Sequence, residues 1–216
     1  MDIPLKYSSL LLEALGNTLL LSFAGGAAAL IIGLIIALFR LSPVPALVRV
    51  GTFYVETIRN TPLTVVFFIV VFVLPQIDLA LPNYTATAIA SLGVYTGAFV
   101  SEAIRAGVNT IGVGQAEAAR ALGLTFGPGM GLIILPQAVR AVVPPMANVW
   151  IALVKNSSIA AAFGVTELTA AGQRINFQEP GDVVAALLWI AVAYLIITLS
   201  SGQIFRLLER KMAVAR

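Results

Sequence analysis

Few residues of this sequence could carry out covalent chemistry. The 216 residues include no cysteine and no histidine, which removes thiol nucleophiles, imidazole bases and nearly every zinc or iron site. Lys155, followed by Ser157 and Ser158, is the candidate for a base with a nucleophile, and no supporting motif accompanies it. We therefore predict no catalytic residue, no metal site and no cofactor, and an intramembrane enzyme is the weakest hypothesis for this chain.

The acidic and basic residues are instead spaced for pairing. Residues three apart on a helix lie on one face, where a glutamate and an arginine can form an ion pair. This spacing occurs at Glu56–Arg59, Glu102–Arg105 and Glu117–Arg120. We expect Glu56 to pair with Arg59 at the membrane edge, whereas Glu102 either pairs locally or faces a central cavity.

Polar residues within apolar segments are candidates for binding. Asn148 follows Pro144 and Pro145, which remove backbone donors and can kink a helix. A polar side chain beside such a break either lines a binding cavity or bonds to a neighbouring helix. Lys155 either attracts the carboxylates of a substrate or extends to the outer interface. The candidate substrate-pathway residues are Asn148, Lys155, Glu102, Thr61 and Asn156.

The elements that position these residues are expected to lie in a membrane. Hydrophobic residues make up 59% of the chain and charged residues only 11%, whereas a soluble domain carries about 25% charged residues. The chain start lacks the basic region and cleavage site of a signal peptide, so we expect the first apolar segment to be retained. No linker divides the sequence, which predicts a single domain over residues 1–216.

The apolar segments predict an all-α membrane protein. A helix that crosses roughly 30 Å of hydrocarbon needs about 20 apolar residues. Five spans are expected at about residues 17–39, 52–75, 84–105, 131–156 and 183–206. In the second span, we expect the helix to run continuously from residues 52–60 into the apolar residues that follow. Small residues in the first span predict close helix packing, namely Gly25, Gly26, Ala27, Ala28, Ala29 and Gly33.

The basic residues predict the orientation of these spans. Lysine and arginine are retained preferentially in cytoplasmic loops. With the N-terminus outside and the C-terminus in the cytoplasm, Lys6 and Arg174 lie outside. The inner segments then hold Arg40, Arg49, Arg59, Arg105, Arg120, Arg206, Arg210, Lys211 and Arg216. We interpret the basic C-terminal tail as a membrane anchor and not as a nucleic-acid-binding patch.

A polar segment separates the third and fourth spans. Its centre is rich in alanine, glutamate and arginine, which are strong helix formers, and Gly123 is suited to the position just beyond a helix end. We predict a short cytoplasmic helix over about residues 114–123. A rigid helix with small side chains can enter a groove of another protein and transmit a push from it.

The spacing around this helix resembles a known signature. Glu117, Ala118, Ala119 and Gly123 are followed by Ile133, Leu135 and Pro136, which fits the pattern E-A-A-x3-G-x9-I-x-L-P of ATP-binding-cassette importer permeases. Residues 16–19, 56–63, 95–102, 136–140 and 153–159 are similar to the polar amino-acid branch of that family, with actinobacterial glutamate-importer permeases the nearest likeness. Many relatives have aspartate where this chain has Asn156, and the loss of that charge mildly favours an anionic substrate.

The resemblance implies a function and a set of partners. The helix over residues 114–123 would be the coupling helix that docks on a cytosolic ATPase dimer, through Glu117, Ala118, Ala119, Arg120, Gly123 and Pro136. A second permease subunit, either a copy or a paralogue, and an extracytoplasmic amino-acid-binding protein would complete an importer in the bacterial cell membrane. Glutamate is the expected substrate, with glutamine, aspartate or basic amino acids as alternatives. A secondary transporter is a weaker hypothesis, because the first span and the fifth span up to residue 205 carry no charge.

Overall fold

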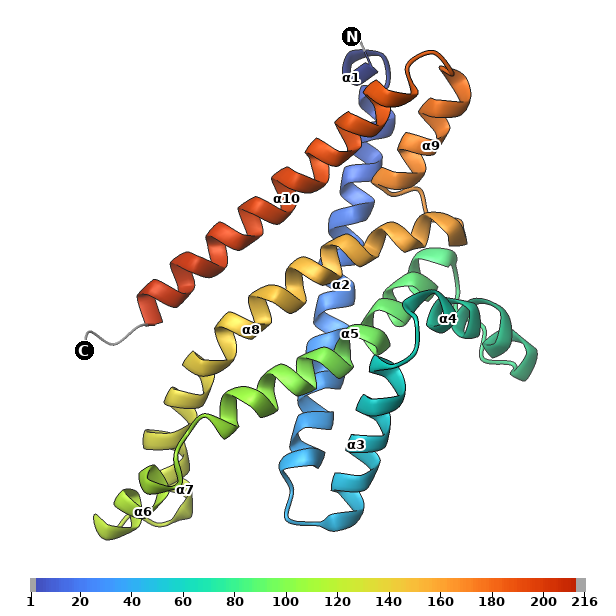
Figure 1. The fold of residues 1–216 in the computed structure, drawn as a ribbon. Coiled ribbons are helices and arrows are strands. Elements are labelled where there is room, and N and C mark those ends of the chain that lie inside the picture. The colour runs from blue at the N-terminus through green and yellow to red at the C-terminus, as the bar shows by residue number, and fades with distance from the viewer. Residues whose placement is uncertain (1–2, 213–216) are drawn as a thin grey trace.

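The computed structural model describes residues 3–212, and these form an all-helical protein without a strand in the described part (Figure 1). Arg216 of the basic tail lies outside the described residues. The long helices are α2 (Ser8–Leu41), α3 (Pro45–Arg59), α5 (Tyr84–Asn109), α8 (Leu135–Asn156) and α10 (Val183–Met212). The shorter elements are α1 (Ile3–Lys6), α4 (Leu63–Phe68), η1 (Ile69–Val73), η2 (Leu74–Ile77), α6 (Val113–Ala121), α7 (Phe126–Gly129), η3 (Met130–Ile134), η4 (Ser157–Phe163) and α9 (Leu168–Gln178).

Helices long and apolar enough to cross a membrane occur where the sequence predicts them. They are Ser8–Leu41, Tyr84–Asn109, Gly127–Phe163 and Val183–Met212. Helix α2 begins at Ser8, earlier than expected from its apolar core, and its first turns include Glu13. Pro144 and Pro145 lie inside α8, which continues through both of them.

The second predicted span is not one continuous helix, and this prediction is wrong. Helices α3 and α4 meet at an angle of 106°. Pro62 has no backbone N–H and disfavours helical geometry in the residue before it. The amide of Asn60 and the hydroxyl of Thr61 donate to carbonyls one turn back, at 2.7 and 2.8 Å, which satisfies the end of α3. If the two halves are counted as one broken span, the described residues have five candidate spans instead of four.

Small residues allow α2 and α5 to pack closely, as predicted. A Cβ atom added to Gly33 would lie 2.4 Å from the Val100 side chain, and one added to Gly93 would lie 2.7 Å from Ala28. On the same face of α2, an added Cβ at Gly26 would lie 2.7 Å from Trp150 of α8. The predicted packing surface is confirmed at these glycines, whereas Ala27 faces away and is exposed.

The helices place two groups of short elements at opposite ends of the bundle. Figure 1 shows α6, α7 and the turn between α2 and α3 at one end, with α1 and α9 at the other. Helices α5 and α8 cross α2 between these ends, and α10 packs against α8. This arrangement lets α8 connect the α6 end of the molecule to the middle of the bundle.

Candidate functional site

Helix α6 is the most exposed element near the middle of the chain. Of its nine residues only Ala119 is buried, while Glu117, Ala118 and Arg120 are exposed. Val113 at its start and Leu122 just after its end are 77% and 75% exposed. An exposed short helix with apolar residues at both ends and alanines between them has the chemistry of a surface that another protein covers.

Gly123 ends α6 in the way its position in the sequence predicts. Its φ is +76°, a backbone conformation that costs an L-residue about 1–2 kcal/mol and costs glycine little. The Gly123 N–H donates to the Arg120 carbonyl at 2.9 Å, and the Leu124 N–H donates to the Ala119 carbonyl at 3.1 Å. These two bonds form the Schellman arrangement that satisfies the last carbonyls of a helix.

The contacts of α6 lead to α8. Helix α6 packs against α7 and η3, and η3 continues directly into α8. The Gln137 amide of α8 donates to the Gln115 side chain of α6 at 3.3 Å and to the Ile133 carbonyl at 2.8 Å. Pro136 lies in the first turn of α8, directly after η3. A force on α6 therefore reaches α8 through a short, continuous set of contacts.

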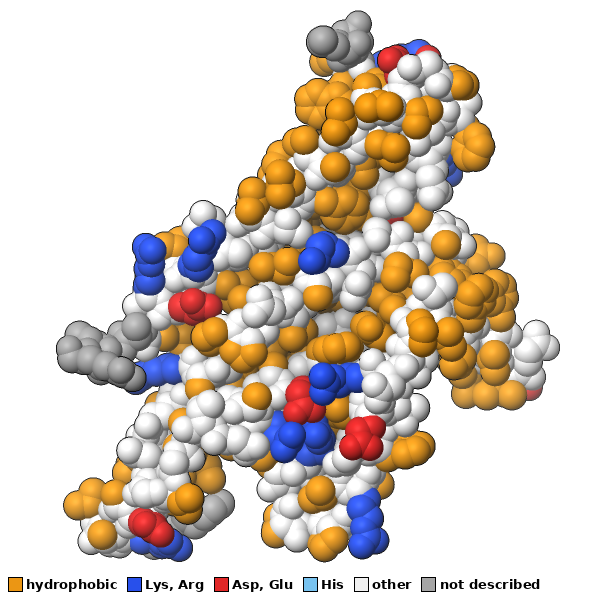
Figure 2. Space-filling model, viewed as in Figure 1, with side chains coloured by type: hydrophobic (Ala, Val, Ile, Leu, Met, Phe, Trp, Pro, Cys, Tyr) orange, Lys and Arg blue, Asp and Glu red, His pale blue; other side chains and the backbone are white. Residues whose placement is uncertain are grey.

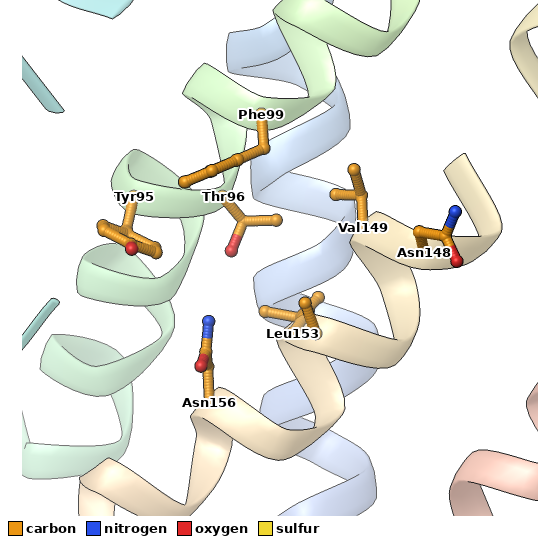
Figure 3. Close-up of a pocket in the computed structure, with 8 residues that line it drawn as sticks. Tyr95, Thr96, Phe99, Asn148, Val149, Leu153 and Asn156 are labelled. Carbon is orange, nitrogen blue, oxygen red and sulfur yellow. The ribbon is translucent and has the colours of Figure 1, made fainter. Parts of the chain in front are cut away.

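A pocket of about 330 Å³ lies between α5 and α8 (Figure 3). Two sequence candidates line it, Asn148 and Asn156, and they lie about two turns apart on α8. The remaining lining residues are Tyr95, Thr96, Phe99, Val149, Ala152 and Leu153. The lining combines aromatic and aliphatic surface with uncharged polar groups, as in sites for small polar molecules.

Three polar side chains of this pocket, those of Thr96, Asn148 and Asn156, form no hydrogen bond among the described residues. The Thr96 hydroxyl is buried, and within residues 3–212 it has no hydrogen-bond partner; Figure 3 shows Thr96 and Asn156 on opposite walls of the pocket. Asn148 is exposed, and the described contacts include no hydrogen bond from its side chain to another helix. A hydrogen bond from Asn148 to a neighbouring helix, the alternative role, is therefore not formed among residues 3–212.

Of the five candidates, Lys155, Thr61 and Glu102 do not line the pocket, and Glu102 is described below. Lys155 is exposed, one residue before Asn156. Thr61 lies at the α3–α4 break, where its hydroxyl bonds to the backbone of the preceding turn. The structure thus brings Asn148 and Asn156 together and leaves Lys155 and Thr61 outside their pocket.

Glu102 of α5 is bound by three arginines instead of one. It accepts hydrogen bonds from Arg105 at 3.0 Å, Arg40 at 2.8 Å and Arg59 at 3.3 Å. The predicted Glu102–Arg105 pair is confirmed. The expected pairing of Glu56 with Arg59 is wrong, because Arg59 turns to Glu102; no ion pair at Glu56 occurs among residues 3–212.

The pairing of Glu117 with Arg120 is likewise absent from the ion pairs of the described residues, and both side chains are exposed. The Ser157 and Ser158 hydroxyls donate to the carbonyls of Val154 and Lys155, so the described contacts contain no serine–lysine catalytic pair. No group of residues in the described part of the chain is arranged to hold a metal ion.

Sequence reasoning missed the residues that α5 contributes to the pocket. Tyr95 and Phe99 are spaced four apart, which places them on one face of a helix, and the candidate Glu102 follows on that face three residues later. That stripe could have been read from the sequence. Arg40 was missed for another reason, since its contact with Glu102 depends on how α2 and α5 cross.

Long apolar helices, an uncharged pocket within the bundle and an exposed helix linked to it define a membrane transport subunit without chemistry of its own. Residues 29–214 match the family described as "Binding-protein-dependent transport system inner membrane component". The chain belongs to this family of transporter permeases.

Similar proteins span almost the whole chain. The "Glutamate transport system permease protein GluC" of Corynebacterium glutamicum is 37% identical, with 95% of each chain covered. The "Glutamine transport system permease protein GlnP" of Escherichia coli is 38% identical, covering 95% of this chain and 94% of the relative. A solved structure described as "Crystal structure of an amino acid ABC transporter with histidines" has a TM-score of 0.88 and 32% identity, with 96% of each chain covered.

Membership of this family assigns passage through the membrane and ATP hydrolysis to different subunits. The chain is the membrane-embedded permease subunit and not an enzyme, and ATP hydrolysis belongs to a separate subunit. The family also implies a second permease subunit beside this one.

Proposed function

We propose that this chain forms half of the translocation path of an ATP-driven amino-acid importer, with its N-terminus outside and α6 in the cytoplasm. The observation that carries the proposal is the exposed α6, which has a defined end at Gly123 and a contact route into α8. In this orientation the turn between α2 and α3, beside Arg40 and Arg49, lies on the cytoplasmic side, as the charge rule requires.

In the proposed cycle, α6 is the coupling helix that fits a cleft of the ATPase subunit. Glu117, Ala118, Ala119 and Arg120 provide the docking surface, and Gly123 and Pro136 fix the geometry at either end of the connection to α8. ATP binding draws two ATPase subunits together and moves α6, and α8 follows through η3. The permease then opens outward to a substrate-loaded binding protein, and hydrolysis returns it to the inward-open state.

The pocket between α5 and α8 is the proposed substrate passage. Its hydroxyl and amide groups suit a polar amino acid, and its lining carries no formal charge. Glutamate is our proposed substrate, supported by the glutamate permease among the relatives and by Asn156 in place of an acidic residue. Glutamine is the second candidate, because amide side chains line the pocket and glutamine permeases are equally similar.

The test is reconstitution of the permease with its ATPase and binding protein in lipid vesicles. Uptake and ATP hydrolysis are measured with glutamate, glutamine, aspartate and arginine. We expect glutamate or glutamine to stimulate hydrolysis and to accumulate, and to do neither without ATP. Uptake that persists after removal of the ATPase subunit would favour a secondary transporter instead.

A matched pair of variants tests the role of α6 in the same assay. Glu117→Ala removes an exposed carboxylate from α6, and Glu13→Ala removes one from α2 near the opposite end of the bundle. We expect Glu117→Ala to lower transport per ATP hydrolysed at least fivefold. The variant would lose the hydrogen bond that Glu117 is proposed to accept from the ATPase subunit, and a hydrogen bond to a charged group contributes about 1.5–3 kcal/mol. Glu13→Ala is expected to leave this ratio unchanged.

A further inference from the structure

The arginines around Glu102 carry more positive charge than that glutamate balances. Three guanidinium groups face one carboxylate, so two positive charges remain without a partner in the cluster. Arg40 is committed to the cluster, because its side chain is only 8% exposed and makes the shortest of the three bonds. Arg59 and Arg105 are different, since 43% and 38% of their side chains are exposed.

Both exposed arginines keep unused donors. Arg59 reaches Glu102 through one nitrogen at the long distance of 3.3 Å. Arg105 uses Nη2 for Glu102, its Nε is buried out of reach of a ligand, and its Nη1 forms no hydrogen bond among the described residues. A guanidinium presents five N–H donors in a planar fork that fits a carboxylate. The two side chains can therefore donate hydrogen bonds to a second carboxylate while they remain bonded to Glu102.

The position of these arginines relates them to the pocket. The Arg59 guanidinium lies over the ring of Phe99, 5.5 Å from its centroid, and Phe99 lines the pocket between α5 and α8. Glu102 lies one turn beyond Phe99 on the same face of α5. Figure 2 shows basic and acidic side chains gathered where α5 passes α3, on the face that also displays α8. A molecule that leaves the pocket toward the α6 end meets this cluster next.

We propose that Arg59 and Arg105 form an anion-binding station at the inner mouth of the pocket, which takes the carboxylate group of the substrate as it leaves. Glu102 is then a positioning residue that holds the two guanidinium groups and weakens their attraction for the substrate, so that release remains possible. This inference rests on the proposed function, because it takes the pocket as the amino-acid passage. The same chemistry would also suit a lipid headgroup phosphate, and the experiment separates the two sources.

The experiment measures binding of ¹³C-labelled glutamate by saturation-transfer NMR. The sample is the assembled permease–ATPase complex in nanodiscs without nucleotide, with glutamine as a second probe that shares the α-carboxylate. Arg59→Gln is expected to weaken binding of both probes about tenfold, because it removes charge-assisted hydrogen bonds. Glu102→Gln is expected to strengthen binding at least twofold, since it frees the arginines from their acidic partner. Arg49→Gln, an exposed arginine of the same helix α3, is the control and should match the wild type.

The opposite signs distinguish a binding role from a structural one. If the cluster only tied the helices together, Arg59→Gln and Glu102→Gln would change binding in the same direction, which would overturn the proposal. The measurement is repeated in nanodiscs of phosphatidylcholine alone and of phosphatidylcholine with phosphatidylglycerol. If Arg59→Gln releases phosphatidylglycerol and leaves glutamate binding unchanged, the station is a lipid site and the proposal is wrong.

Failure of this inference can be told apart from failure of the proposed function. If the wild-type complex transports no amino acid in the vesicle assay, the proposed function fails. If wild-type transport is normal but the Arg59 and Glu102 variants bind like the wild type, the anion-binding station alone is refuted.

Discussion

Replacing Gly123 by alanine tests how the end of α6 contributes to coupling. Gly123 has φ +76°, and an added Cβ would meet no atom within 4 Å. The cost of Gly123→Ala is therefore conformational only, about 1–2 kcal/mol for an L-residue in the left-handed region. Because 1.4 kcal/mol is a tenfold change in an equilibrium constant, we expect the population of molecules in which α6 ends with the left-handed backbone at residue 123 to fall roughly 5- to 30-fold.

A helix of nine residues has too little stability of its own to offset this conformational cost. Isolated helices shorter than about 12–15 residues are marginal in water, and α6 buries only Ala119 against its neighbours. In reconstituted vesicles, Gly123→Ala should retain membrane insertion and basal ATP hydrolysis, while transport per ATP falls at least fivefold. The assay measures substrate accumulated and phosphate released in the same sample.

Two further variants make this prediction specific. Gly123→Asn should recover much of the coupling, because asparagine tolerates the left-handed conformation better than alanine does. Gly127→Ala adds a methyl group to a nearby glycine of α7 that also has open space but no positive φ, and it should behave as the wild type. If Gly123→Ala and Gly127→Ala couple equally well, the backbone at Gly123 does not control coupling and the reasoning is refuted.

Three other predictions concern packing, pH and substrate. Gly33→Ala should destabilise the protein by about 1–3 kcal/mol, since overpacking displaces Val100, and a thermal melt followed by tryptophan fluorescence measures the change. The Lys6 ammonium holds the pKa of Glu179 below its ordinary value of 4.5. The Lys6–Glu179 ion pair therefore stabilises the fold above that pH, and this stabilisation is lost as the pH falls through the lower pKa of the folded state. Glu179→Gln should remove this small part of the pH dependence of the melting temperature. Asn156→Asp should lower glutamate uptake relative to glutamine uptake at least fivefold, because it places a like charge in the pocket.

Each of these predictions has a result that would contradict it. Gly16→Ala adds a methyl group to α2 with no atom within 4 Å, and a melt as low as that of Gly33→Ala would show that crowding is not the cause. A Glu179→Gln melt with the pH dependence of the wild type would rule out the ion pair as a stabilising contact. Equal loss of glutamate and glutamine uptake in Asn156→Asp would mean that the variant disturbs the pocket as a whole.

Elements controlled by local signals were predictable from sequence. Gly123 ends α6 because only its own backbone conformation matters there, and the glycines of α2 mark a packing face because small residues leave room for a neighbour. The composition that predicts a membrane protein is likewise a property of single segments. These features need no knowledge of how distant segments meet.

Features that depend on distant contacts were not predictable in the same way. Arg59 fits equally well with Glu56 by spacing, and only the crossing of α3 and α5 brings it to Glu102. Pro62 is a local signal for a break, whereas the apolar residues that follow it predict a continuous span. The pocket needs α5 and α8 side by side, so that sequence reasoning reached Asn148 and Asn156 but not Thr96.

In the proposed importer, α6 lies in the cytoplasm and is covered by the ATPase subunit. The chain has no cysteine, so Glu117→Cys introduces a single site for a membrane-impermeant maleimide, with Glu13→Cys as the counterpart at the other end of the bundle. We predict that intact cells label only Glu13→Cys, that permeabilised cells also label Glu117→Cys, and that the assembled ATPase protects Glu117→Cys from labelling. Labelling of Glu117→Cys from outside, or labelling that the ATPase does not change, would contradict the account.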